Sequence, residues 1–163
     1  MLALAGLFAC LPGVPVAASV QLAVPFVPQE KDTCGAASLA MVLRYWGVPA
    51  DHDALAASAG EHGQRGIAGS RLVEAARQHG VFAVAYEGDL AQLKDSLERG
   101  RPVIVALAAR GGLHHDVVVV GFEDGRVLMH DPAEGRDRSM RESEFDRRWS
   151  AASRWSLLVL PRR

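Results

Sequence analysis

The strongest constraint on the fold of this chain is a change of sequence pattern near residue 102. Before that point, apolar residues recur at helical spacing in segments that start at polar residues and stop at glycine. After it, short runs rich in valine and leucine follow one another, and Glu123-Asp124-Gly125 reads as the turn of a β-hairpin. A helical front half followed by a hairpin-connected back half predicts an α+β fold with an antiparallel sheet.

The expected elements follow from these two patterns. The predicted helices of the front half span residues 34–46, 51–59, 70–79 and 89–99. The predicted strands span residues 81–86, 102–109, 116–122, 126–132 and 154–160. Asp32 or Thr33 is the expected N-cap of the first helix, and Ser70 that of the third. One more helix is predicted over 139–149, because Ser139 and Glu142 match a capping box.

Length and charge limit the number of domains and the class of partner. The chain has 163 residues, of which 49% are hydrophobic and 23% charged, and this suffices for one globular core. The formal net charge is −1, so there is no one-signed field of the kind that binds nucleic acid. We expect one domain over residues 19–163 and no nucleic-acid partner.

The N-terminal stretch is uncharged and resembles a secretory leader. Its apolar run is shorter than the about 20 residues of a membrane-spanning helix, and small residues at 16–18 suit cleavage, so we expect a signal peptide over 1–18. The basic start of such a leader is missing, which favours a true start further upstream. Leu7 to Cys10 also resembles a bacterial lipobox, which would place a lipid on Cys10 as the one membrane attachment. A buried N-terminal helix is the remaining alternative, and two prolines disfavour it.

A single thiol remains once that leader is removed. Cys34 is then the only cysteine, so no internal disulfide can form. A lone thiol is either a buried small hydrophobe or a reactive group. Cys34 would lie in the first turn of the first helix, where free backbone N–H groups and the helix dipole stabilise a thiolate, which is the nucleophilic form. Gly35 would allow a substrate to approach the backbone closely.

Two adjacent histidines are candidates for the base that a thiol nucleophile needs. His114 and His115 stand at the start of the valine-rich strand. Side chains alternate across a strand, so one of them faces the first helix and the other faces away. Alternation alone leaves the choice between them open.

Two further polar residues are placed to assist a nucleophile and its base. The hairpin turn returns Asp131 to the neighbourhood of His115, where a carboxylate can accept the imidazole N–H and hold its tautomer; an Asp-Pro turn is the alternative explanation. Gln29 lies in an extended segment five residues before Cys34 and could donate its amide to an oxyanion. An exposed loop glutamine is the alternative there. Surface or supporting roles are expected for the remaining histidines, which are His52, His62, His79 and His130.

Three stretches of the sequence resemble a known family. They are VPFVPQEKDTCGAASLAMVLRYWG, HHDVVVVGFEDGRVLMHDPAEG and ESEFDRRW. Together they are similar to the bacteriocin-processing, double-glycine leader cysteine peptidases, peptidase family thirty-nine, of the papain-like superfamily. The resemblance implies a papain-like fold, in which a nucleophile at a helix N-terminus packs on a C-terminal antiparallel sheet. It also implies Cys34 as nucleophile, His115 as base, Asp131 as the residue that orients the base and Gln29 as oxyanion donor.

The resemblance predicts acyl transfer by a cysteine peptidase outside the cytoplasm, in the periplasm or envelope. Such chemistry requires no metal and no organic cofactor, and no Cys or His pair has zinc-binding spacing. Family members joined to ABC transporters cut leaders after Gly-Gly on the cytosolic side, whereas this chain is similar to stand-alone, exported members. We therefore expect a peptide or protein substrate and an export or envelope assembly system as partner. Asp116 follows the base, where an aromatic residue is common.

Two alternative functions share these residues. A cell-wall peptide amidase or transpeptidase uses the same order of cysteine and histidine, while the Asp131-Pro132 pair and the spacing of Gln29 favour a peptidase. A non-catalytic peptide-binding module that kept the fold is the other alternative, in which Cys34 would react like an ordinary thiol. The rate at which the thiol is alkylated, followed against pH, separates that module from an enzyme.

Overall fold

The structure, a computed structural model, describes residues 19–30, 32–59 and 67–162. The expected signal peptide, the lipobox cysteine Cys10 and His62 lie outside the described residues. The helices are α1 (Cys34–Tyr45), α2 (His52–Ser58), α3 (Gly69–Gln78), the 3-10 turn η1 (Arg110–Gly112), α4 (Leu90–Glu98) and α5 (Glu142–Ser150). The strands are β1 (Val20–Gln21), β2 (Phe82–Glu87), β3 (Val103–Ala108), β4 (His114–Glu123), β5 (Arg126–Asp131), β6 (Gly135–Arg141) and β7 (Trp155–Leu160).

The strands form one antiparallel sheet, which confirms the α+β class. The order across the sheet is β2-β7-β3-β4-β5-β6, and β1 pairs with β4 off this path. β3 and β4 lie in the middle and are paired over six residues, from Val103–Val119 to Ala108–His114. Such central strands are buried on both faces, which is why their sequences are continuous apolar runs rather than alternating ones.

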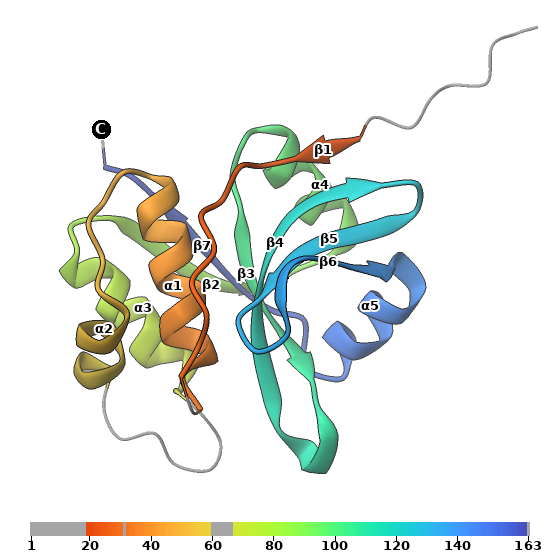
Figure 1. Cartoon of the computed structure of the whole chain (residues 1–163). Coiled ribbons are helices and arrows are strands. Elements are labelled where there is room, and N and C mark those ends of the chain that lie inside the picture. The colour runs from red at the N-terminus through yellow and green to blue at the C-terminus, as the bar shows by residue number, and fades with distance from the viewer. Residues whose placement is uncertain (1–18, 31, 60–66, 163) are drawn as a thin grey trace, which may run out of the picture.

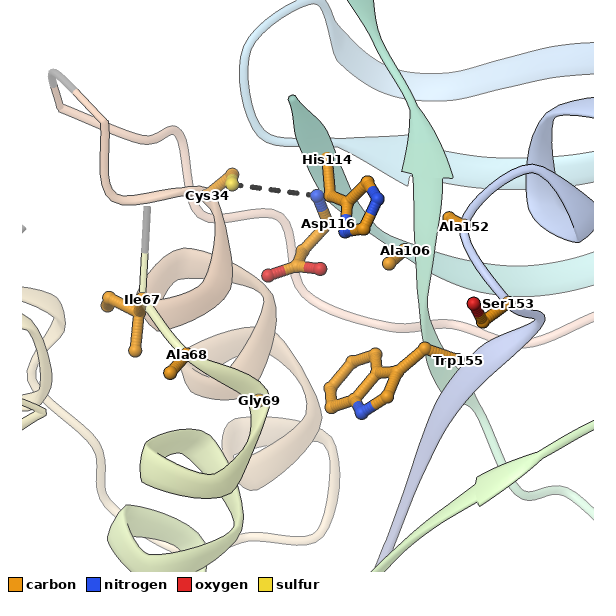
Figure 2. A pocket seen from close by; sticks show the side chains of 10 residues that line it. All are labelled: Cys34, Ile67, Ala68, Gly69, Ala106, His114, Asp116, Ala152, Ser153 and Trp155. Carbon is orange, nitrogen blue, oxygen red and sulfur yellow. Dashed lines mark hydrogen bonds between the residues drawn. The ribbon is translucent and has the colours of Figure 1, made fainter. Parts of the chain in front are cut away.

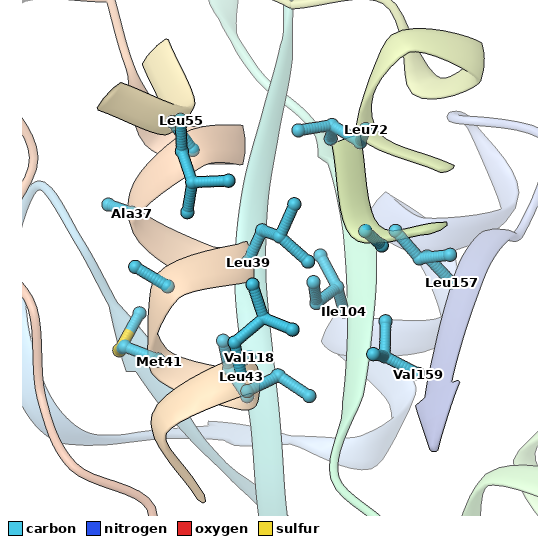
Figure 3. Close-up of a cluster of buried hydrophobic side chains, with 14 of the residues drawn as sticks. Ala37, Leu39, Met41, Leu43, Leu55, Leu72, Ile104, Val118, Leu157 and Val159 are labelled. Atoms are coloured by element: carbon cyan, nitrogen blue, oxygen red, sulfur yellow. The ribbon is translucent and has the colours of Figure 1, made fainter. Parts of the chain in front are cut away.

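Helices cover both faces of the sheet (Figure 1). Helices α1, α2 and α3 share an apolar cluster with one face, which includes Ile104 and Val118 (Figure 3). Helices α4 and α5 share a second cluster with the opposite face, which includes Val117 and Val119. Alternate residues of β4 therefore feed different cores. No helix of the described ranges is long and apolar enough to cross a membrane.

Most local signals of the sequence appear in the structure where they were predicted. Gly47 follows α1 with a φ of 73° and ends it. Asp51 caps α2 by accepting from the Ala54 backbone N–H at 2.9 Å, and Asp89 caps α4 in a full capping box with Gln92. The Asp124-Gly125 turn has positive φ at both residues, as a two-residue hairpin turn of type I′ requires.

The helix predicted over 139–149 is wrong in its first turn. Residues 135–141 form strand β6, which pairs with β5, and α5 begins only at Glu142. The capping box does not exist, because the Ser139 hydroxyl accepts from Arg126 Nε at 3.0 Å instead. The strand was missed because β6 is an edge strand exposed on both faces, with charged side chains and no apolar alternation to reveal it.

The predicted cap of the third helix is also wrong. Helix α3 begins at Gly69 after the N-cap position Ala68, and Ser70 lies inside the helix. Gly69 sits so close to the Trp155 indole that a Cβ there would lie 2.6 Å from the ring. The start of α3 therefore packs against a residue more than eighty positions later in the chain, a contact that local sequence cannot show.

Candidate active site

Cys34 is the first residue of α1, and its backbone amide belongs to an uncapped helix start. Thr33 occupies the N-cap position but makes no capping bond. Its hydroxyl donates to the Glu30 carbonyl at 3.0 Å and also lies 2.9 Å from His52 Nε2. Because no side chain of the described residues takes the first N–H groups of the helix, these donors are available for a negative charge near the Cys34 sulfur.

The sulfur lies at the edge of the central strand β4. Pairing of β4 with β5 stops at Val118 opposite His130, and no other strand of the described residues pairs with this edge of β4 beyond that point. Helix α1 takes its place there. The Asp116 backbone N–H donates to Cys34 Sγ at 3.5 Å, as Figure 2 shows, and the Asp116 carbonyl accepts from the Ser38 hydroxyl at 3.3 Å.

The structure brings His115 together with both of its expected partners. His115 Nε2 lies 2.7 Å from Asp131 Oδ1, and the Cys34 side chain is a hydrogen-bonding and charged neighbour of the same imidazole. His114 is exposed and lines the pocket beside the sulfur. Alternation could not choose between the two histidines, because Cys34 lies at the strand edge rather than above one face.

The pKa of His115 is strongly shifted by these neighbours. Burial lowers the pKa of the imidazole, but hydrogen bonds to Asp131 and Cys34, together with their charges, outweigh burial and raise the pKa to about 10. For Asp131, burial raises the pKa, and the hydrogen bond and charge of His115 outweigh burial, so the pKa of this carboxyl lies below its ordinary value. At neutral pH the pair is therefore an imidazolium and a carboxylate.

Asp131 is held in place by its own turn. Its Oδ1 atom accepts from the backbone N–H groups of Ala133 at 2.8 Å and Glu134 at 3.1 Å as well as facing His115. Asp131 therefore begins a turn and also contacts the His115 imidazole, so both of the explanations given for it describe the structure. The turn fixes the carboxylate before any substrate arrives.

Gln29 lies beside that turn rather than free in a loop. Its backbone N–H donates to the Pro132 carbonyl at 3.0 Å, which ties the segment before α1 to the end of β5. The side-chain oxygen of Gln29 is buried and has no hydrogen-bond partner among the described residues. The described part of the chain likewise shows no acceptor bonded to its amide nitrogen.

A pocket of ≈ 340 Å³ opens beside the sulfur (Figure 2). Its walls include Ile67, Trp155 and Ala106, and Asp116 points into it. Burial raises the pKa of Asp116 to about 7, although the charge of His115 acts in the opposite direction. The sequence analysis noted Asp116 only as a departure from a pattern; an acid inside a buried strand is the signal that marks it.

Gly35 lies in close contact with other parts of the protein. A Cβ at this residue would lie 2.9 Å from Asp116 Oδ2 and 2.9 Å from Leu72 Cδ1. The missing side chain makes room for these two groups within the protein, and the expectation that Gly35 also allows a close approach of substrate stays a prediction. The contact explains how the Asp116 carboxyl fits against α1.

Two other histidines, His130 and His79, bond backbone groups of the fold. His130 is buried, lies 3.0 Å from the Val24 carbonyl through Nε2, and accepts from the Asp137 N–H at 3.2 Å through Nδ1. His79 bonds the Ala75 carbonyl at the end of α3. Within the described ranges, no three His, Cys, Asp or Glu side chains gather as a metal site.

Comparisons with known proteins identify a family and relatives of this chain. The model of the peptidase C39-like family matches residues 21–157. An uncharacterized protein of Methanothermobacter marburgensis is 32% identical over 110 residues, which cover 68% of this chain and 72% of the relative.

Solved structures with the same fold include two peptidases. A double glycine motif protease from an AMS/PCAT transporter, in complex with the leader peptide, has a TM-score of 0.72 and 28% identity over 88% of this chain and 95% of that chain. The peptidase domain of Streptococcus ComA, a bi-functional ABC transporter of a quorum sensing pathway, has a TM-score of 0.72 and 25% identity over 83% and 97% of the two chains.

The helix-borne thiol on an antiparallel sheet and these likenesses define a papain-like, cysteine-peptidase type of fold. The chain belongs to the peptidase C39-like family, since the family model covers most of its length.

Proposed function

We propose that this protein is a cysteine peptidase that hydrolyses peptide bonds with Cys34, His115 and Asp131. The observation that carries the proposal is the His115 imidazole, held 2.7 Å from Asp131 and close enough to the Cys34 side chain, at the start of a helix, for that side chain to raise the pKa of the imidazole. This is the order of nucleophile, base and orienting group that acyl transfer through a thiol uses.

The reaction begins with the thiolate of Cys34 attacking the peptide carbonyl. A pKa of about 10 keeps His115 protonated at neutral pH, so the imidazolium can donate its proton to the leaving amine as the C–N bond breaks. The neutral imidazole then takes a proton from water, and the hydroxide so formed attacks the acyl-enzyme. Breaking the C–S bond releases the acid and restores the thiolate with the imidazolium.

Stabilisation of the developing oxyanion falls to two donors. They are the Cys34 backbone N–H, to which no side chain of the described residues is bonded, and the N–H groups of the Gln29 side-chain amide. Loss of one such donor typically raises the barrier by about 3 kcal/mol. The backbone bond from Gln29 to Pro132 supports this role, because it fixes the amide relative to the turn that carries Asp131.

The proposed substrate is a peptide or protein, and the proposed setting is outside the cytoplasm. One similar structure was determined with a leader peptide and the other belongs to an ABC transporter, which supports a peptide substrate for this chain. The uncharged, leader-like stretch over 1–18 supports export to the periplasm or envelope, with an export or assembly system as partner.

The test is hydrolysis of a broad peptide library by the wild-type protein and by Cys34→Ala, His115→Ala and Gln29→Ala. We expect Cys34→Ala and His115→Ala to abolish cleavage, and Gln29→Ala to lower kcat about 100-fold while KM changes little. His79→Ala is the matched control for His115→Ala, because His79 bonds only the end of α3. Cleavage that survives in Cys34→Ala, or its absence from the wild-type protein, would overturn the proposal.

A further inference from the structure

Asp116 is a buried acid beside the nucleophile that the proposed mechanism does not use. It is 9% exposed and follows His115 directly on β4. Its backbone N–H donates to Cys34 Sγ, and its backbone carbonyl accepts from the Ser38 hydroxyl. Its carboxyl oxygens have no hydrogen-bond partner among the described residues. Figure 2 shows the carboxyl directed into the pocket next to the sulfur.

The pocket has the shape and lining of a site for one side chain. Its volume of ≈ 340 Å³ lies near the lower limit for ligand pockets. Ile67, Ala106 and the Trp155 indole provide apolar walls around the single acid. Because Cys34 lines the same pocket, a group seated there belongs to a residue close to the carbonyl that the sulfur attacks.

Electrostatics favour a cation as the occupant. An ionised carboxylate in an apolar pocket is costly unless an opposite charge and hydrogen-bond donors meet it. The ionisable groups that face it are His115 and Cys34, which interact with each other, and the exposed His114 at the rim. An ammonium or guanidinium group would bring the donors that the carboxyl lacks.

We infer that this pocket binds a lysine or arginine side chain of the substrate, with the aliphatic stem against Trp155 and Ile67 and the cationic head on Asp116. The inference rests on the proposed function for its place in a reaction, and it adds the substrate class. Long basic side chains suit such a site, because their stems pack on apolar surface while the charge reaches a polar group.

The experiment compares peptides that differ in one residue near the scissile bond, with lysine or its uncharged analogue norleucine scanned across each position. At one position we expect kcat/KM to be about 10- to 100-fold higher for lysine, as a charge-assisted hydrogen bond predicts. Asp116→Asn should remove this preference, so that the ratio of kcat/KM for lysine and norleucine peptides falls to about 1. Asp116→Ala serves as a second variant, and circular dichroism verifies that both are folded.

Glu98→Gln is the matched control, since it removes an exposed carboxylate of α4 far from the pocket lining. It should leave the preference for lysine unchanged. Binding of the same peptides to Cys34→Ala and to Cys34→Ala/Asp116→Asn, measured by calorimetry, gives a readout that needs no catalysis. Equal affinity for lysine and norleucine peptides, or a lysine preference that persists without Asp116, overturns the inference. Absence of Cys34-dependent hydrolysis overturns the proposed function instead. In that case the calorimetry still tests whether the pocket binds a lysine side chain.

Discussion

Two carboxyl groups lie near the same imidazole, and their pKa values are shifted in opposite directions. Asp131 accepts from His115 and two backbone N–H groups, so its pKa falls below the ordinary value despite burial. The Asp116 carboxyl accepts no hydrogen bond from the described residues, and burial raises its pKa to about 7. Pairs of titratable groups whose surroundings move their pKa values apart are typical of sites with separate chemical roles.

Removal of the Asp131 charge should lower the pKa of His115. The histidine pKa is raised in the folded protein, so its contribution to stability is complete below about pH 6.5 and is lost as pH rises toward 10. In Asp131→Asn we expect the pKa of His115 to fall by about 1–3 pH units. NMR titration of the His115 ring would measure this directly, and the alkaline limb of kcat/KM should move by the same amount. An unchanged titration would show that Asp131 does not hold the imidazolium.

Asp116 destabilises the folded protein as pH rises, whereas an acid with a lowered pKa such as Asp131 does so as pH falls. Asp116→Asn should therefore remove a loss of stability that occurs with rising pH. The pKa of Asp116 is raised on folding from 3.8 to about 7, so its favourable contribution is present below about pH 4 and lost as pH rises through 7. A tenfold shift in ionisation corresponds to about 1.4 kcal/mol. Relative to wild type, the variant should therefore gain a few kcal/mol of unfolding free energy between pH 4 and pH 8, measured by urea denaturation. Parallel curves for the two proteins would contradict this.

At the scale of the elements, strand edges explain both the site and the main error of the sequence analysis. The β4 edge left open beyond Val118 is where α1 docks through Ser38 and Cys34. β6 is the outermost strand, paired on one side only, and its polar sequence gave no strand signal. A strand lies at the edge of a sheet when no other strand pairs with one of its sides. The apolar periodicity of a single segment does not show whether such a partner exists.

One aspartate variant and one serine variant compare the helix cap that the structure contains, Asp89, with the cap that the sequence predicted but the structure lacks, Ser139. Asp89 accepts from the Gln92 backbone N–H at 2.8 Å, so Asp89→Ala should lower the unfolding free energy by about 1 kcal/mol. Ser139 lies exposed in β6 and caps no helix, so Ser139→Ala should change it by less than about 0.5 kcal/mol. Chemical denaturation of both variants provides the comparison. An equal loss for Ser139→Ala would support the capping box that the structure lacks.

At the scale of the whole molecule, one sheet joins two apolar cores. Ile104 belongs to the cluster under α1, while its neighbours Val103 and Val105 belong to the cluster under α4 and α5. Because β3 supplies side chains to both cores, its unfolding would disrupt both of them at once. The described chain should therefore unfold as one cooperative unit.

The tryptophans on the two sides of the sheet offer a test of this cooperativity. Trp46 packs on the α1 side and donates to the Val159 carbonyl at 2.8 Å, whereas Trp149 is buried in the opposite core. Variants that keep only Trp46 or only Trp149, with phenylalanine elsewhere, should each show a fluorescence transition that coincides with loss of circular dichroism in urea. Separate midpoints within one variant would show that the cores unfold independently.

The sequence by itself determined the α+β class, most helix and strand positions, the hairpin turn and the placement of Cys34 at a helix start, because all of these depend on short-range periodicity and capping. The tertiary structure decided that His115 rather than His114 faces Asp131, that Asp116 lines a pocket, and that residues 135–141 form a strand. These features depend on where distant segments meet: α1 at an open strand edge, Gln29 beside Pro132, and Gly69 beside Trp155. A short stretch of sequence does not predict these contacts, since the same residues could pack equally well against other segments of the chain.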